Sequence, residues 1–472
     1  MNADRSDRPN IVWLTLDSIR YDRTTMGEHA RDTTPNMQRI ASLPGGESFS
    51  QCITTARWSL PSVASILTGT YQQYHAMGSR TEVLPKGIDT VAERLAERGY
   101  HTAGLSANSF FAEETGLDRG FERFEKVNPG SFARTADVRS LLEFGLGIRR
   151  HSAGFDPDKR KHRPDFLVNQ FAKRRLASFA GEHEPFLFMA HYHGAHHPYY
   201  PPLAFQGTYT DEIGMSPAEA SEVAFARTTN VYERMAEAES FTPAEWDAIR
   251  AMYDTLVAYT DGIVGDLFDH LRSLNLDDTI VVITADHGDL LGERNLLSHK
   301  LVLHDALVHV PLVVYGFGDL VGCGDELVQH VDLVRTLLEH VGGRTEGLRG
   351  YDLRERSRDF AISQAGPGTS DGLDIIQSHD GSFDRSAFHE SALTALRSTE
   401  FKYQRSDDRS ELFELPDETE DVSSLHPETV AEFDAYLTEW LTEHEGRSIE
   451  RTEAQFDDEV RQRLADLGYR TE

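Results

Sequence analysis

Cysteine is nearly absent from this 472-residue sequence, which holds only Cys52 and Cys323. Two cysteines so far apart in the chain form neither a disulfide framework nor the paired spacing of a cysteine-bound metal site. Because disulfides are rare in proteins of reducing compartments, we expect the protein to work in such a compartment.

Positive charge is also scarce. Lysine and arginine together number 47 against 78 acidic residues, the formal net charge is −31, and only seven of the 47 are lysine. This balance excludes the basic footprint of sequence-independent nucleic-acid binding. The acidic residues are scattered along the chain and form no acidic tail. The composition therefore favours a halophilic protein over a binder of cationic partners, because salt at 1 M limits the reach of self-repulsion to roughly 3 Å.

Long apolar runs are missing as well. No stretch is long enough to span a membrane, and the polar segment Met1–Asn10 does not have the pattern of a signal peptide. We therefore expect a soluble, cytoplasmic protein. The length allows one large α/β domain with a smaller appendage, or two domains.

The strongest motif is a β-prone run, Thr279–His287, which ends in the pair Asp286-His287. Its continuous Val/Ile stretch predicts a strand buried on both faces of a sheet, and open α/β sheets place their chemistry beyond the carboxyl ends of such strands. An adjacent carboxylate and imidazole suit a divalent metal ion. The simpler alternative is a helix-capping Asp followed by a surface His.

A second apolar strand, Asn10–Leu16, ends in Asp17 in the same way. Two parallel strands that both end in acids can bring them to one metal ion at the same edge of the sheet. The alternative for Asp17 is that it caps the next turn or pairs with Arg20. Taken together with Asp286 and His287, the pattern favours a metal ligand.

Ser59 opens a predicted helix that has Pro61 in its first turn and stops at Gly69. A hydroxyl at a helix N-terminus lies at the positive end of the helix dipole, where free N–H groups can also hold a tetrahedral oxyanion. Ser59 is therefore a candidate nucleophile that a metal ion would activate. The alternative, favoured for an isolated Ser-x-Pro, is that Ser59 only caps the helix.

Histidine gathers after a further predicted strand, Pro185–His193, in a proline-stiffened loop that contains His196 and His197. These imidazoles either face a pocket or lie in solvent. A metal centre is a further alternative, but the spacing of the histidines is not that of a simple zinc site. A basic stretch at 149–163 is either a mobile loop near an anionic substrate or a solvated surface insertion, and we favour the latter.

Lys300 is a candidate anion contact because the chain otherwise uses arginine; the alternative is an ordinary surface lysine.

Strands alternate with helical segments through most of the chain, which predicts a doubly wound α/β fold with a mainly parallel sheet. Towards the C-terminus, Ala392–Arg405 and Ser410–Leu415 predict paired strands and Pro427–Glu443 predicts an amphipathic helix. We place a catalytic α/β domain at 9–345, a C-terminal α+β subdomain with a small antiparallel sheet at 346–445, and a tail at 446–472.

Taken in order, these stretches resemble the sulfatase family of the alkaline-phosphatase superfamily, from about Pro9 to Leu425. The resemblance implies an alkaline-phosphatase-like fold and an ester hydrolase. It is carried by six motifs: Asn10–Asp22, Ser59-Leu60-Pro61-Ser62 with Leu67-Thr68-Gly69, His196-His197-Pro198-Tyr199, Thr279–Gly288, Lys300 through Val310-Pro311-Leu312, and Ala395–Leu415.

The resemblance also implies roles for single residues. It implies one divalent ion, held by three residues at the ends of the two strands: Asp17, Asp286 and His287. It implies Ser59 as the nucleophile, and three residues that contact the transferred group or protonate the leaving oxygen: His196, His299 and Lys300. One imidazole among carboxylates favours Mn²⁺ or Zn²⁺ over Mg²⁺ or Ca²⁺.

Two positions depart from the usual sulfatase pattern. Sulfatases carry Cys or Ser followed by x-Pro-x-Arg, and the first residue is oxidised to formylglycine; here Val63 stands at the Arg position. Ser18 stands where many sulfatases have a second Asp ligand. The remaining set is similar to the phosphonate monoester hydrolases and phosphoglycerol transferases of the superfamily, because an unmodified Ser must be released by attack at phosphorus or sulfur.

The leading hypothesis is a metal-dependent sulfatase-like hydrolase, or a phosphotransferase, that cleaves sulfate or phosphate/phosphonate esters through Ser59. Its substrate would be an anionic ester derived from a glycan or a lipid head group. Two alternatives stay open: an orthodox sulfuric ester hydrolase with formylglycine at position 59, and a catalytically silent binder of sulfated or phosphorylated glycans.

Overall fold

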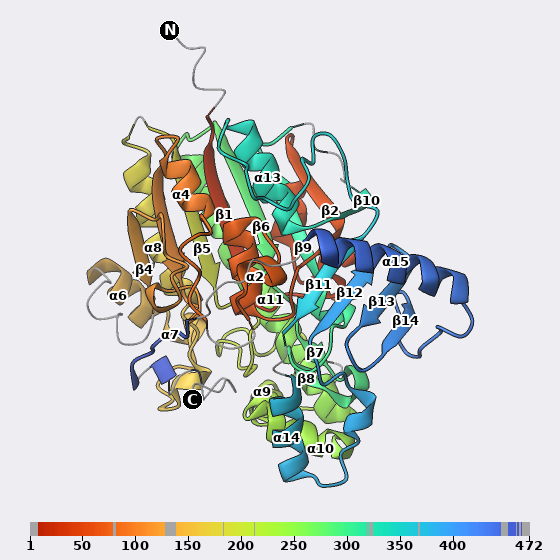
Figure 1. Ribbon diagram of the computed structural model, residues 1–472. Helices are drawn as coiled ribbons and strands as arrows, with labels where there is room; N and C mark the ends of the chain where they lie inside the picture. Colours follow the sequence, from red (N-terminus) through yellow and green to blue (C-terminus); the bar gives the residue numbers. More distant parts are fainter. Residues whose placement is uncertain are drawn as a thin grey trace.

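An eight-stranded sheet runs through the centre of the computed structural model (Figure 1). The structure describes residues 8–78, 82–127, 138–182, 184–211, 213–318, 320, 324–366, 369–444, 452–458, 460–461 and 464. The strand order is β10-β2-β9-β6-β1-β5-β3-β4, and all neighbours are parallel except that β9 is antiparallel to both β2 and β6. The strands are β1 (Asn10–Leu16), β2 (Gly46–Ile53), β3 (His101–Ser106), β4 (Arg123–Lys126), β5 (Phe186–Tyr192), β6 (Thr279–Ala285), β9 (His309–Tyr315) and β10 (Gly324–Val328).

The three neighbouring strands β5, β1 and β6 carry the sequence motifs. Every residue of β5 and β6 is buried, and in β1 only Asn10 is partly exposed. Their apolar runs have no polar face because helices cover both sides of the sheet. Leu16 of β1 pairs with Ala285 of β6 and with Tyr192 of β5. Since the strands are parallel and end at the same level, the residues that follow them meet at one edge of the sheet.

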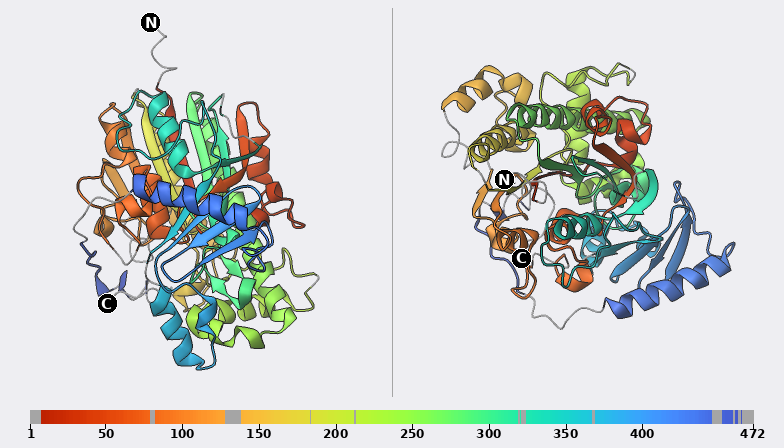
Figure 2. Two further views of the ribbon diagram at one scale, coloured as in Figure 1. Left: turned by 45° about the vertical axis from the view of Figure 1, so that its right-hand side comes forward. Right: turned by 90° about the horizontal axis from the view of Figure 1, so that it is seen from above.

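Helices cover the two faces of this sheet, as the view from above in Figure 2 shows. One layer contains α2, α4 and α13, and the other contains α1, α8 and the long α11. The predicted doubly wound α/β fold with a mainly parallel sheet is therefore confirmed. These helices are α1 (Pro35–Ala41), α2 (Ser59–Thr68), α4 (Val91–Ala96), α8 (Asp165–Phe179), α11 (Pro243–Ser273) and α13 (His330–His340).

A smaller antiparallel sheet, ordered β11-β12-β13-β14, forms the C-terminal part together with α15 (Figure 1). The helix spans Pro427–Glu443, as predicted. The sequence analysis did not predict β11, which joins the small sheet to the main one: the N–H of Gln364 donates to the carbonyl of Thr55 at 2.8 Å. The strands are β11 (Ala361–Ala365), β12 (Leu393–Arg397), β13 (Phe401–Arg405) and β14 (Ser410–Glu414).

Three further helices gather near the carboxyl edge of the main sheet: α9 (Pro217–Thr228), α10 (Val231–Glu237) and α14 (Thr369–His379) (Figure 1). Within the described ranges, we find no helix that combines the length and the apolar character needed to cross a membrane. Most of the predicted tail at 446–472 lies outside the described residues. Of its described part, Thr452 accepts a hydrogen bond from the N–H of Val83.

Candidate active site

Asp17, Asp286 and His287 come together at the carboxyl edge of the sheet because they directly follow the paired strands β1 and β6. All three are at most 1% exposed, and one candidate ligand atom of each lies within 4.8 Å of the other two. His287 Nε2 is 3.6 Å from Asp17 Oδ1 and 3.7 Å from Asp286 Oδ2. Arg20, the alternative partner for Asp17, instead pairs with Asp22 at 2.7 Å.

The electrostatics of this cluster show two carboxyl groups buried close together. Burial, and then the negative charge of Asp286, raise the pKa of Asp17 to about 7. Asn108 donates to Asp17 Oδ2 at 2.8 Å, and His191 Nε2 lies 3.2 Å from Asp286 Oδ2. Two carboxylates and one imidazole, all buried at one point, are a donor set that fits a divalent metal ion.

Ser59 lies beside these residues: its Oγ is 3.2 Å from His287 Nε2, and the side chain is buried. The prediction that Ser59 caps α2 is wrong, because the N-cap is Trp58 and Ser59 is the first helical residue. Trp58 has the extended backbone of a cap residue, and the Ser59 hydroxyl, one position later, lies against His287. Gly69 ends the helix in the left-handed conformation, as predicted.

Two buried cations, Lys300 and Arg57, also belong to this region. Burial, and then the charge of Arg57, lower the pKa of Lys300 to about 7. Burial lowers the pKa of Arg57 to about 10. Cations buried near each other favour an anion between or beside them, which fits the negative charge of an ester substrate. The alternative of an ordinary surface lysine is therefore wrong for Lys300, which is 7% exposed.

His196 and His299 border the same cluster. The ring centroid of His299 is 4.4 Å from that of His287 and 5.2 Å from that of His196. Burial, and then the neighbouring imidazoles, lower the pKa of each ring well below its ordinary value. Both rings are therefore neutral near pH 7, and the solvated-loop alternative is wrong for His196, which is 2% exposed.

The basic stretch at 149–163 contacts the loop that contains His196. Arg163 donates to the carbonyl of His196 at 3.1 Å and to the carbonyl of Gly194. Lys161 Nζ lies 2.8 Å from a carboxylate oxygen of Glu222. The favoured interpretation as a solvated surface insertion is wrong for Lys161 and Arg163, which are buried. Their partners are distant in sequence, so the local pattern could not reveal the burial.

Three residues to which the sequence analysis gave no role interact with residues of the site: Arg57, Asn108 and Asp289. Asn108 follows β3 at the same edge of the sheet, so the strand-end argument used for Asp17 applies to it equally. Asp289 accepts a hydrogen bond from Tyr199 at 2.7 Å. Its position shortly after Asp286-His287 was the available signal.

The chain is similar to known proteins over most of its length. The family model described as Sulfatase matches residues 9–343. A choline-sulfatase of Rhizobium meliloti is 26% identical over 366 residues, which are 73% of this chain and 70% of that protein. A multifunctional alkaline phosphatase superfamily protein of Trinickia caryophylli is 25% identical over 386 residues, 72% of this chain and 74% of the relative.

Solved structures share the fold. The phosphonate monoester hydrolase of Agrobacterium radiobacter aligns with a TM-score of 0.70 at 20% identity, over 93% of this chain and 96% of that one. A structure in complex with its substrate D-glucosamine-2-N,6-O-disulfate aligns with a TM-score of 0.67 at 18% identity, over 93% and 98% of the two chains.

Proposed function

Because this chain belongs to the sulfatase family, and is thus an ester hydrolase, we propose that it cleaves sulfate or phosphorus esters through Ser59 with the help of a divalent metal ion. The observation that carries the proposal is the 3.2 Å distance between Ser59 Oγ and His287 Nε2. It puts a buried hydroxyl against the cluster in which two carboxylates and an imidazole meet.

Asp17, Asp286 and His287 are the residues that would hold the ion. When bound, the ion would lower the pKa of the Ser59 hydroxyl and offset the negative charge of the ester. His287 Nδ1 donates to the carbonyl of Gly288 at 2.8 Å, which leaves Nε2 directed at Ser59 and the carboxylates. Among common ions, this donor set favours Mn²⁺ or Zn²⁺ over Mg²⁺ or Ca²⁺.

Each side chain of the site then has its own role in the reaction. The Ser59 hydroxyl gives its proton to water, and its Oγ attacks the phosphorus or sulfur atom in line with the leaving oxygen, so that the new bond to Oγ forms as the bond to the leaving oxygen breaks. Lys300 and Arg57 stabilise the non-bridging oxygens, and Lys300, whose pKa is about 7, gives its proton to the leaving oxygen. His196 and His299 contact the transferred group. Water or an acceptor alcohol releases the group from Ser59.

Phosphorus esters are the better substrates for an unmodified serine. Val63, at the place of the sulfatase arginine, is 3% exposed inside α2, whose ten residues are all buried. No charged side chain therefore occupies that position, and Ser59 is proposed to act unmodified. The likeness to phosphonate monoester hydrolase supports phosphorus esters as substrates of an unmodified serine. The structure in complex with glucosamine disulfate supports glycans as one substrate class, and lipid head groups are the other class proposed.

The second candidate function is that of an orthodox sulfatase. Ser59 occupies the position that sulfatases modify, and Pro61 of the modification motif is present. Peptide mass spectrometry decides between the two forms, because formylglycine lacks two hydrogens of serine. Loss of two hydrogens at position 59 would establish the modified form, and an intact serine would support direct attack.

The deciding experiment compares aryl esters of sulfate, phosphonate and phosphate diester in high salt, with Mn²⁺, Zn²⁺, Mg²⁺ or Ca²⁺ restored after chelation. We expect metal-dependent turnover that prefers the phosphorus esters. A preference for sulfate would move the protein to the orthodox branch. Tight binding of sulfated or phosphorylated glycans without any turnover would instead identify the protein as a catalytically silent glycan binder.

A further inference from the structure

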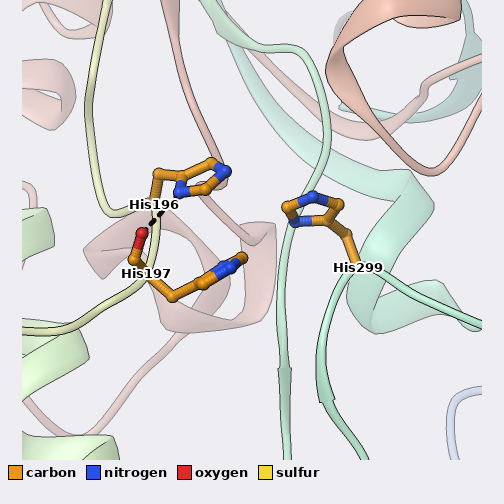
Figure 3. A group of neighbouring side chains, drawn as sticks. All are labelled: His196, His197 and His299. Atoms are coloured by element: carbon orange, nitrogen blue, oxygen red, sulfur yellow. Dashed lines mark hydrogen bonds between the residues drawn. The ribbon is translucent and has the colours of Figure 1, made fainter. Parts of the chain in front are cut away.

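Two loops bring three imidazoles together beside the proposed catalytic residues (Figure 3). His196 and His197 follow β5, and His299 follows the short hairpin of β7 (Leu290–Leu291) and β8 (Leu297–Ser298). One ring nitrogen of each histidine lies within 4.8 Å of the other two. All three residues are at most 2% exposed, and Figure 3 shows their rings directed toward one another. The proposed function gives no role to His197.

Each of these rings is oriented through Nδ1. His196 Nδ1 donates to the carbonyl of His197 at 2.6 Å, and His299 Nδ1 lies 2.8 Å from Asp289 Oδ1. His197 Nδ1 lies 3.2 Å from Ser298 Oγ and 3.6 Å from the second oxygen of Asp289. Metal-binding histidines characteristically bond to a carbonyl or carboxylate in this way, which fixes the tautomer and aims the ring.

His197 Nε2 supplies a second, independent observation. This atom is buried and has no hydrogen-bond partner among the described residues. Buried polar atoms without a partner are rare in folded proteins, and a bound ion is one of the few explanations. Asp289, which is fully buried, provides a nearby negative charge to balance a cation.

The geometry points to a second divalent metal site formed by His196, His197 and His299, and the donor set favours Zn²⁺ over Mg²⁺ or Ca²⁺. Three imidazoles with an open fourth position are a zinc arrangement, whereas Mg²⁺ and Ca²⁺ require oxygen ligands. Zinc–nitrogen bonds of about 2.0–2.1 Å place the nitrogens roughly 3.3 Å apart, a contraction that rotation of the rings can supply.

This site shares no ligand with the one at Asp17, Asp286 and His287 but adjoins it, since the rings of His287 and His299 are 4.4 Å apart and both groups also lie close to Asp289. Its existence does not depend on the chemistry proposed for Ser59. One consequence does rest on the proposed function: with zinc bound, the His196 and His299 contacts to the transferred group would pass through the ion.

The test is the zinc content of the full chain, stripped with a chelator and then dialysed against a fixed free Zn²⁺ concentration in molar KCl. We expect two zinc ions per chain for the unchanged protein, one for Asp286→Asn, one for His197→Gln, and none for the double variant. His75→Gln is the matched control: His75 is fully buried in α3 (Gln72–His75), outside both clusters, so this variant should keep both ions.

Cobalt provides a check that does not depend on counting ions. Asp286→Asn loaded with Co²⁺ should show the visible absorption of a tetrahedral, nitrogen-bound ion, and His197→Gln added to that variant should abolish it. One zinc in the unchanged protein that disappears in Asp286→Asn would overturn the inference, and so would two zinc ions in His197→Gln.

If circular dichroism shows that His197→Gln does not fold, Asp286→Asn decides alone. Zinc that this variant retains, with the tetrahedral cobalt spectrum, supports the site, and a variant without zinc refutes it. Ester turnover enters none of these measurements, so failure of the Ser59 mechanism would leave the result intact.

Discussion

Single side chains in this protein owe their chemistry to burial beside other ionisable groups. The pKa of Asp17 rises because it is buried beside Asp286, and that of Lys300 falls because it is buried near Arg57. Burial beside a group of like charge therefore moves the pKa of each group far from its ordinary range. Groups shifted toward the working pH are efficient proton donors and acceptors, and a cluster of them marks a functional site.

We predict that Lys300 sets the alkaline limb of the pH–rate profile. A proton donor must be protonated, and the pKa of Lys300 is about 7, so kcat should be highest below this pH and fall about tenfold per unit above it. The measurement is kcat against pH for an alkyl ester, whose leaving oxygen needs a proton. An activated aryl ester, which leaves without one, is the control. A limb that persists unchanged in Lys300→Gln would contradict the assignment.

At this scale, the sequence predicted what depends on strand ends and missed what depends on distant partners. Asp17 and Asp286 follow apolar strands, and parallel pairing alone brings them together. Ser59 was placed one position wrong in its helix because the cap depends on the backbone of Trp58. The burial of His197 comes from a loop that tertiary packing positions, so the local pattern left a pocket and solvent as equal alternatives.

At the scale of elements, the loop after β5 and the end of β1 behave as one unit. The N–H of Ala195 donates to the carbonyl of Asp17 at 2.9 Å. Gly194 has a positive φ of 56°, and a Cβ at this position would lie 2.3 Å from that carbonyl oxygen. Only glycine allows this approach, so the position of the His196 loop is coupled to that of a proposed metal ligand.

We predict that Arg163→Gln loosens this unit. Arg163 holds the carbonyls of Gly194 and His196, and its removal should lower kcat by roughly 10- to 100-fold, as for other residues that orient a site. It also leaves the carboxylate of buried Asp165 without its cation, 3.7 Å away, at a cost of about 3–5 kcal/mol in the free energy of unfolding. Steady-state kinetics and urea unfolding measure the two effects.

The matched control is Arg149→Gln, in the same basic stretch, because the Arg149 side chain is exposed. Both its kcat and its unfolding midpoint should equal those of the unchanged protein. A wild-type kcat in Arg163→Gln would show that the loop does not need this support.

Elements with a strong internal pattern were predictable, and elements defined by contacts were not. The bounds of β1 and α15 agree with the predicted ranges because a continuous apolar run and an amphipathic period each carry their own signal. The short strand β11 has no such signal, and its place depends on pairing with β12 and on the contact of Gln364 with Thr55. The basic stretch was misread for the same reason.

At the scale of the whole molecule, buried ion pairs join the C-terminal sheet to the catalytic part. Arg397 of β12 lies 2.9 Å from one oxygen of Asp305, and Lys402 Nζ of β13 lies 3.7 Å from the other oxygen of the same carboxylate. Elsewhere the net charge of −31 leaves an excess of acidic side chains that repel one another in the folded state.

We predict that this repulsion makes stability depend on salt. The Debye length falls from about 10 Å at 0.1 M to about 3 Å at 1 M, so KCl should raise the unfolding temperature steeply up to about 1 M. The measurement is the thermal unfolding midpoint across a KCl series, with sucrose of equal osmolality as the uncharged control. An unfolding temperature that does not respond to KCl, or responds equally to sucrose, would argue against a halophilic protein.

The central claim is that Ser59 is the nucleophile of a metal-dependent esterase, and Ser59→Ala tests it most directly. Turnover of the preferred ester and bound metal are measured on the same sample, beside Ser65→Ala, a buried serine of the same helix that contacts His75. We predict that Ser59→Ala loses turnover by roughly 10⁴-fold or more while its metal content stays unchanged, and that Ser65→Ala keeps both. Turnover retained in Ser59→Ala would contradict the account.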